Sequence, residues 1–129
     1  MDSYRTPLAR ARGLGAAKHG ATHWIGERVS SIALVPLSLW AVYAVFKLAG
    51  AGYDGAVAWL GHPLNATLGS LFAIVTFWHM HAGMRVIVED YYAGAQRAVL
   101  LLINLFACVL VGALAVFSIL KVALSGGAF

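Results

Sequence analysis

Five residues could do chemistry in this otherwise apolar chain. His79, His81 and Arg85 lie within a long apolar stretch, and Asp90 and Tyr91 follow it. Ionisable side chains inside a bilayer cost roughly a few kcal/mol each, so they are candidates for function by default. An imidazole can bind haem iron, and a phenol can donate a hydrogen bond to a carbonyl oxygen. A lone histidine can equally well bond a neighbouring helix, so the spacing of these residues decides between the two interpretations.

Helical geometry divides these residues between two faces. Each residue of an α-helix advances by about 100°, so the step from His79 to Asp90 makes three turns plus about 20° and leaves both on one face. Gly83 lies on this face too and leaves room there for a flat ligand or another helix. His81 points the opposite way, and Arg85 lies nearer to that second face. We therefore expect His79, rather than His81, to be a ligand.

Haem is a plausible ligand for this face because it is large, flat and mostly apolar and fits between the helices of a bundle. His19, His23 and His62 all lie outside the apolar stretches, so no second histidine ligand is apparent on another helix. If His79 binds haem with two histidine ligands, the second must come from a partner subunit. Iron with both axial positions filled favours electron transfer over oxygen chemistry.

Asp90 and Tyr91 suit the reduction of a quinone, which requires protons as well as electrons. The tyrosine hydroxyl can donate a hydrogen bond to a quinone carbonyl. A carboxylate at the water boundary can relay protons. The alternative interpretation is an ordinary helix end, with an acid and aromatic side chains at the membrane interface.

The elements that must position these residues are three transmembrane helices. Of the 129 residues, 61% are hydrophobic and 11% are charged, whereas a soluble domain has about 25% charged residues. A helix that crosses a bilayer needs about 20 apolar residues. We predict an all-α membrane protein, one part of a heteromeric helix bundle. Its transmembrane region would be 29–124, with helices at about 29–48, 64–88 and 98–123.

The remaining features concern the ends and connections. Residues 1–28 form a basic segment without the pattern of a cleavable signal, and 49–63 form a Gly-rich connector. Pro36 removes a backbone donor within the first helix, so we expect a kink there. The single cysteine, Cys108, can form neither an intramolecular disulfide nor a CxxC metal site.

The basic residues predict the orientation. One side of the membrane would carry Arg5, Arg10, Arg12, Lys18, Arg28, Arg85 and Arg97. The other side would carry only Lys47 and Lys121. The positive-inside rule then places the N-terminus and the loop between Glu89 and Arg97 in the cytoplasm. A nucleic-acid-binding protein would carry its basic residues along a surface, so nucleic acid is not an expected partner.

The motif around the two histidines resembles the smaller hydrophobic membrane anchor subunit of succinate dehydrogenase (respiratory complex II). The stretch that begins at His79 reads HMHAGMRVIVEDY. The family pattern is a histidine, a glycine four residues later and an Asp-Tyr pair, which His79, Gly83, Asp90 and Tyr91 match. The Glu-Asp-Tyr form and the N-terminal GLGAAKHG stretch are similar to the alphaproteobacterial and mitochondrial branch. The larger anchor subunit has a histidine where this chain has Val86, so the smaller subunit fits better.

The resemblance implies roles for particular residues. His79 would be one axial ligand to the iron of a haem b shared with the larger cytochrome b anchor subunit. Tyr91 would hydrogen-bond ubiquinone, with Asp90 close to the quinone as a proton relay. Arg28 would lie near the haem propionates, where a charge-assisted pair is reasonable. Weaker candidates for the same neighbourhood are Ser30, Ser31, His19 and His23.

The resemblance also implies a function, as an anchor subunit of succinate:ubiquinone oxidoreductase with no independent activity. A flavoprotein subunit would oxidise succinate, an iron–sulfur subunit would carry the electrons, and this chain would hold them to the lipid membrane. Two alternatives remain open: an anchor of a quinol:fumarate reductase, and a non-redox scaffold or assembly protein in which His79 is merely packed. Half of a small transporter is disfavoured, because the chain lacks paired broken helices.

Overall fold

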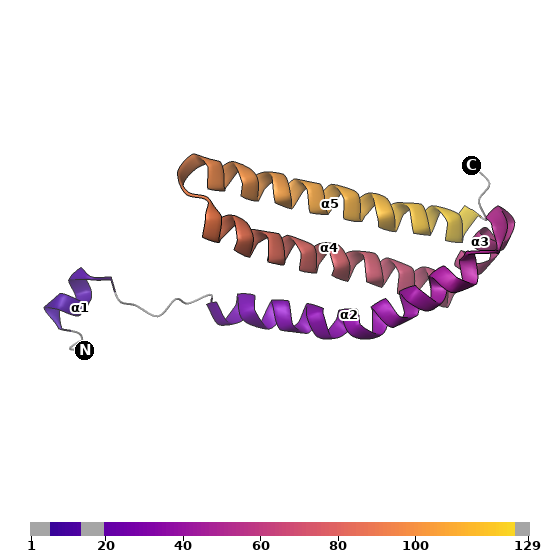
Figure 1. Cartoon of the computed structure of the whole chain (residues 1–129), viewed down its shortest axis with the longest axis horizontal. Helices are drawn as coiled ribbons and strands as arrows, with labels where there is room; N and C mark the ends of the chain where they lie inside the picture. The colour runs from indigo at the N-terminus through magenta and orange to yellow at the C-terminus, as the bar shows by residue number, and fades with distance from the viewer. Residues whose placement is uncertain (1–5, 14–19, 126–129) are drawn as a thin grey trace.

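The computed structural model describes residues 6–13 and 20–125, and within them the only regular elements are helices. The elements are α1 (Pro7–Ala11), α2 (Gly20–Leu48), α3 (Gly52–Leu60), α4 (Pro63–Tyr91) and α5 (Gly94–Ser125). Figure 1 shows α2, α4 and α5 running alongside one another. Among the described residues, these three helices are long and apolar enough to cross a membrane. The prediction of an all-α membrane protein with three spans is therefore confirmed.

The three long helices extend beyond the expected spans. α2 begins at Gly20 rather than near Val29, and α4 ends at Tyr91 rather than at Val88. Apolar runs mark only the part of a helix that matches the hydrocarbon thickness, whereas the backbone hydrogen bonds continue into the polar interface. We expected residues 1–28 to lie outside the membrane helices. Residues 20–28 instead belong to α2 and continue directly into the first span. α5 also begins earlier than expected, at Gly94.

α3 lies within the stretch that we expected to be a Gly-rich connector. Its Trp59 ring stacks on the Trp40 ring of α2, with centroids 5.8 Å apart. The Asn65 amide of α4 donates a hydrogen bond to the Trp59 carbonyl at 2.9 Å. Contacts to two different long helices thus hold α3 at the end of the bundle away from the α4–α5 turn (Figure 1).

α4 is the central helix and contacts both α2 and α5. Its buried residues include Ala66, Gly69 and Ala73, which recur at helical spacing. A Cβ added at Gly69 would lie 3.6 Å from Trp40 of α2 and 3.5 Å from Ile119 of α5. Small residues let membrane helices approach closely, and here they allow large side chains from both neighbours to cover α4.

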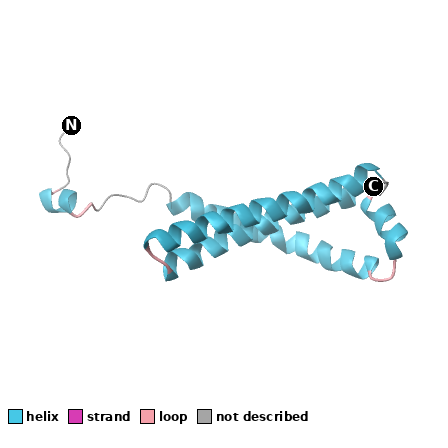
Figure 2. Ribbon diagram, turned by 90° about the horizontal axis from the view of Figure 1, so that it is seen from above, coloured by secondary structure: helices cyan, strands magenta, loops and turns pink. Residues whose placement is uncertain are grey.

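α2 does not follow α4 and α5 along its whole length. Figure 2 shows it crossing the pair that α4 and α5 form. Pro36 lies inside α2, and the helix bends along its length in Figure 1. The bend agrees with the kink expected where proline removes a backbone hydrogen bond. The close approach of α2 to α4 therefore involves only part of each helix.

Most of the apolar surface remains exposed in the isolated chain. In each of the three spans, only 11% of the most apolar window is buried. Exposed side chains include large ones such as Trp78 and Phe106. An apolar surface of this extent requires lipid or partner helices around it. The exposed surface is thus what a helical membrane protein places against lipid or partner helices.

α4 and α5 pack closely at Gly112, and we predict that a large side chain there destabilises the protein. A Cβ added there would lie 3.3 Å from three atoms of Phe77. Gly112→Leu should destabilise the α4–α5 packing by about 1–3 kcal/mol, the usual cost of overpacking. The midpoint of heat-induced aggregation of the detergent-purified complex would measure it. Ala107→Leu, on an exposed part of α5, is the matched control, and equal midpoints for the two variants would contradict the prediction.

Candidate functional site

A hydrogen bond between two helices ties His79 of α4 to Ser30 of α2. The antiparallel arrangement of the helices brings the first half of α2 beside the last half of α4 (Figure 1). The Ser30 Oγ lies 3.0 Å from the His79 Nδ1, and it also donates to the Glu27 carbonyl at 2.9 Å. Ser30 is only 5% exposed. Its hydroxyl therefore has these two protein partners and little access to other ones.

This arrangement favours one position for the proton of His79. A serine hydroxyl has one proton, and Ser30 gives it to the Glu27 carbonyl, which can only accept. With that proton donated to the carbonyl, the Ser30 Oγ is an acceptor for the His79 Nδ1, the direction that corresponds to the Nδ1-protonated tautomer. In a neutral imidazole with its proton on Nδ1, the Nε2 lone pair is free. Within the described residues Nε2 has no hydrogen-bond partner, so it is available to a ligand.

His81 has the opposite arrangement, because it is bound to α5. The Asn104 Nδ2 lies 3.0 Å from the His81 Nδ1 and donates to the His81 carbonyl, also at 3.0 Å. Since that carbonyl can only accept, the amide nitrogen rather than the oxygen must face it. The Cys108 thiol donates to the Asn104 Oδ1 at 3.4 Å, which agrees with this assignment. The amide therefore donates to Nδ1 as well, and the neutral His81 ring carries its proton on Nε2.

The two histidines thus differ in what they can do. His79 presents an unprotonated Nε2, whereas both His81 nitrogens are unsuited to a metal, one accepting from Asn104 and the other protonated. No cluster of three or more His, Cys, Asp or Glu side chains that could hold a metal ion occurs within the described residues. A haem, which carries its own four equatorial nitrogens, fits a single imidazole of this kind. The sequence analysis did not predict that Asn104 would hydrogen-bond His81.

The face of α4 beyond His79 is open at Gly83. A Cβ added there would meet no atom within 4 Å, so the room expected beside His79 is present in the isolated chain. Arg28, two residues before Ser30, is exposed, and its guanidinium lies 5.4 Å from the centre of the Trp24 ring. Arg28 lies two residues, about 200°, from Ser30, so its side chain leaves α2 on a different face from the serine that contacts His79.

Asp90 and Tyr91 are the last two residues of α4, and both are exposed. The helix therefore continues far enough for Asp90 to share the face of His79. Glu89 is bound instead, with its carboxylate 2.8 Å from the Arg85 Nε and 3.7 Å from an Arg97 nitrogen. Among the described residues, Asp90 and Tyr91 have no hydrogen-bond or ion-pair partner. Their polar groups thus face outward from this end of the chain.

The weaker candidates divide into those that the structure places and those that it does not. The Ser31 Oγ donates to the Glu27 carbonyl of its own helix at 2.8 Å. His19 lies outside the described residues, and so does the side chain of His23. The structure places Ser30 in hydrogen-bonding contact with His79, the candidate iron ligand, whereas Ser31 bonds only within its own helix.

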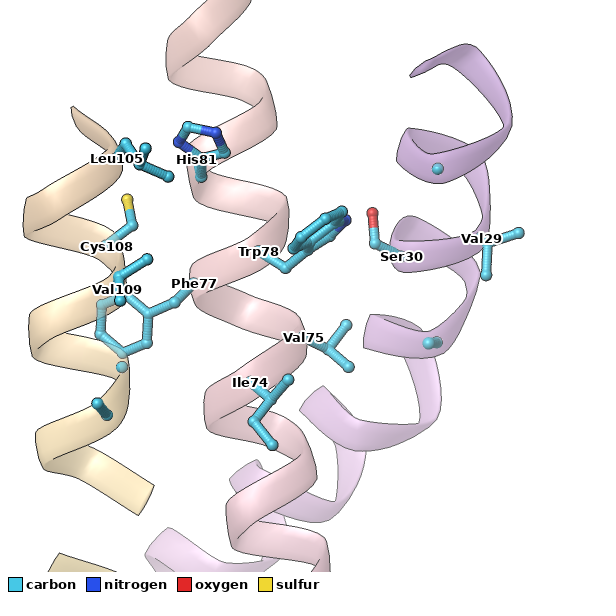
Figure 3. A pocket seen from close by; sticks show the side chains of 14 residues that line it. Val29, Ser30, Ile74, Val75, Phe77, Trp78, His81, Leu105, Cys108 and Val109 are labelled. Atoms are coloured by element: carbon cyan, nitrogen blue, oxygen red, sulfur yellow. The ribbon is translucent and has the colours of Figure 1, made fainter. Parts of the chain in front are cut away.

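Sequence reasoning missed a hollow of about 660 Å³ on one side of the bundle. It is lined by all three long helices, with Trp78 and His81 of α4 between Ser30 of α2 and Cys108 of α5 (Figure 3). Small residues at Gly26 and Ala33 of α2 leave space opposite α5. Trp78, which lines the hollow, is 63% exposed.

Comparison with known proteins assigns this sequence to a family. The family described as succinate dehydrogenase/fumarate reductase transmembrane subunit matches residues 2–121. The match therefore includes all of α2 and α4, α5 as far as Lys121, and each candidate site residue. No solved structure matches the chain significantly.

Curated relatives match over most of their length. The succinate dehydrogenase hydrophobic membrane anchor subunit of Paracoccus denitrificans is 31% identical over 94% of each chain. The subunit of the same name from Rickettsia bellii is 36% identical over 68% of this chain and 70% of its own. The succinate dehydrogenase membrane anchor subunit of Reclinomonas americana is 28% identical over 64% of this chain and 71% of its own. These three relatives thus all carry the name of a succinate dehydrogenase membrane anchor subunit.

Proposed function

Because this chain belongs to the succinate dehydrogenase/fumarate reductase transmembrane subunit family, we propose that it supplies one axial haem b ligand and part of a ubiquinone-reduction site. It is a membrane anchor subunit of succinate dehydrogenase, a part of the oxidoreductase complex that does not itself oxidise succinate. The proposal concerns what this anchor contributes to electron transfer. The observation that carries it is the free Nε2 of His79, which the Ser30 hydrogen bond produces.

His79 would be the haem ligand of this chain. Its Nε2 points away from the Ser30 bond, and Gly83 leaves the space that a flat group needs beside it. Bound haem b would supply a one-electron redox centre. Arg28 would pair with a propionate, and the larger cytochrome b anchor subunit would supply the second ligand. His81 would instead hold α4 to α5 through Asn104.

Tyr91 and Asp90 would line the quinone site. Tyr91 is 82% exposed at the end of α4, and its hydroxyl is available to a quinone carbonyl. Asp90 is exposed beside it and can exchange protons with water, whereas the Glu89 carboxylate is bound to arginine. The tyrosine would orient the quinone, and the aspartate would hold and deliver protons.

The orientation follows from which charges gather at each end of the bundle. Arg28, Arg85 and Arg97 lie toward the end with the α4–α5 turn, whereas Lys47 and Lys121 lie toward the other end (Figure 1). By the positive-inside rule, the first end would face the cytoplasm of a bacterial cell, in its cytoplasmic membrane. The iron–sulfur and flavoprotein subunits would bind there, close to Tyr91.

Purification of the complex through a tag on this chain would test the proposed function. We expect the larger anchor, iron–sulfur and flavoprotein subunits to copurify and to reduce ubiquinone with succinate. A reduced-minus-oxidised spectrum should contain a low-spin b-type signal. A complex without haem absorbance would favour the scaffold alternative, in which His79 is merely packed.

A quinol:fumarate reductase remains the second candidate within the same family, because the family description includes both enzymes. The curated relatives named above carry the name succinate dehydrogenase, which favours succinate oxidation. Activity assays of the purified complex, run once with ubiquinone and once with a low-potential menaquinone, would distinguish the two enzymes. Faster fumarate reduction with menaquinol than succinate oxidation with ubiquinone would support the second candidate.

A further inference from the structure

We propose that Ser30 is the positioning residue for His79, holding its ring in the one tautomer that can bind iron. The inference rests on the proposed function, since it concerns the same histidine. It assigns a role to a hydroxyl on a different helix, which never touches the iron or the quinone. Ser30 acts through the hydrogen bond that its oxygen accepts from the His79 Nδ1.

The geometry leaves Ser30 little freedom to act differently. Its hydroxyl proton is used by the Glu27 carbonyl at 2.9 Å, so its oxygen can only accept from the Nδ1 at 3.0 Å. If Ser30 instead donated its proton to Nδ1, Nε2 would carry the histidine proton and could not bind a metal. The backbone carbonyl one turn earlier in α2 thus decides, through Ser30, which nitrogen of His79 is free.

Such a bond has consequences that a packing contact does not. Metal-bound histidines donate their second N–H to a fixed acceptor, which orients the ring and raises its basicity. A more basic imidazole stabilises ferric iron relative to ferrous iron. Loss of the Ser30 hydroxyl should therefore raise the midpoint potential of the haem and speed its dissociation. Loss of a partner of this kind typically weakens metal binding about 10–100-fold.

The chain offers a matched control at the next residue. Ser31 also donates to the Glu27 carbonyl, at 2.8 Å, and lies on the same turn of α2. Within the described residues, it makes no hydrogen bond to His79. Ser31→Ala therefore removes the same kind of intrahelical bond without touching the histidine. Ser30→Thr keeps a hydroxyl. Ser30→Val has nearly the same shape as the threonine variant but has no hydroxyl.

The experiment compares these variants in the purified native complex by haem content, visible spectrum and redox titration. We expect Ser30→Ala to lose haem about tenfold faster than wild type. A tenfold weaker preference for ferric iron would raise the midpoint potential by about 59 mV for this one-electron couple. Ser31→Ala should match wild type, and Ser30→Thr should recover most of the difference. If the complex with Ser30→Ala does not assemble, Ser30→Thr and Ser30→Val replace it. These two variants have side chains of nearly equal volume, and they compare haem loss and midpoint potential with and without a hydroxyl at position 30.

The inference and the proposed function can fail separately. The role of Ser30 would be overturned if Ser30→Ala and Ser31→Ala lost haem at the same rate and had the same midpoint potential. The same result for Ser30→Thr and Ser30→Val would also overturn it. The ligand assignment would survive that result if His79→Ala still removes the haem signal. A haem signal unchanged by His79→Ala would instead overturn the proposed function, and the role of Ser30 would fall with it.

Discussion

Replacing His79 with alanine is expected to remove the b-type haem signal from the purified complex. The imidazole would be the only iron ligand that this chain provides, and alanine has no atom that can replace its Nε2. The loss of affinity should exceed the roughly 10–100-fold effect of losing a partner that only supports a ligand. A reduced-minus-oxidised spectrum, normalised to the protein content of the purified complex, measures the remaining haem.

His81→Ala is the matched control, because His81 lies only two residues away on the same helix. It bonds Asn104 through its Nδ1, so its removal should weaken the α4–α5 contact and leave the haem spectrum in place. The converse result, with the signal kept in His79→Ala and lost in His81→Ala, would keep the family and reverse the choice of ligand. Loss of the signal in both variants, with subunits still assembled, would contradict the different roles assigned to them.

Replacing Tyr91 with phenylalanine is expected to lower ubiquinone reduction while succinate oxidation by an artificial dye continues. The change removes one hydroxyl and keeps the ring of a residue that is 82% exposed. A hydrogen bond of this kind contributes about 0.5–1.5 kcal/mol. Because about 1.4 kcal/mol corresponds to tenfold in rate, the quinone reductase rate should fall by up to about tenfold. Parallel assays with ubiquinone and with the dye measure the two activities.

Tyr92→Phe is the control for this experiment. Tyr92 is the next residue, is 45% exposed and follows the last residue of α4. The Tyr92 hydroxyl has no role in the proposed quinone site. Ubiquinone reduction and dye-linked succinate oxidation by the Tyr92→Phe complex should therefore both stay near wild type. An equal fall of dye and quinone activities in Tyr91→Phe would show damage to the soluble subunits or their docking. That outcome would remove Tyr91 from the quinone site.

The fold was largely predictable because each span carries its own signal. Length, apolar composition and the distribution of charge predicted three transmembrane helices, and the three long helices confirm them. The ends were less accurate, since apolar runs do not report where backbone hydrogen bonding stops. α3 was missed because its stability comes from contacts outside it, such as the stacking of Trp59 on Trp40. A short segment without a long apolar run has no comparable signal.

The sequence by itself determined which residues of this protein share a helical face. The period of a single helix relates His79, Gly83 and Asp90 whatever else surrounds them. Only the tertiary structure decided which histidine has a free nitrogen, because Ser30 and Asn104 reach α4 from two other helices. Nothing in the spacing along α4 reports what α2 and α5 place against it. Local periodicity therefore selected the candidate face, and hydrogen bonds between helices distinguished His79 from His81.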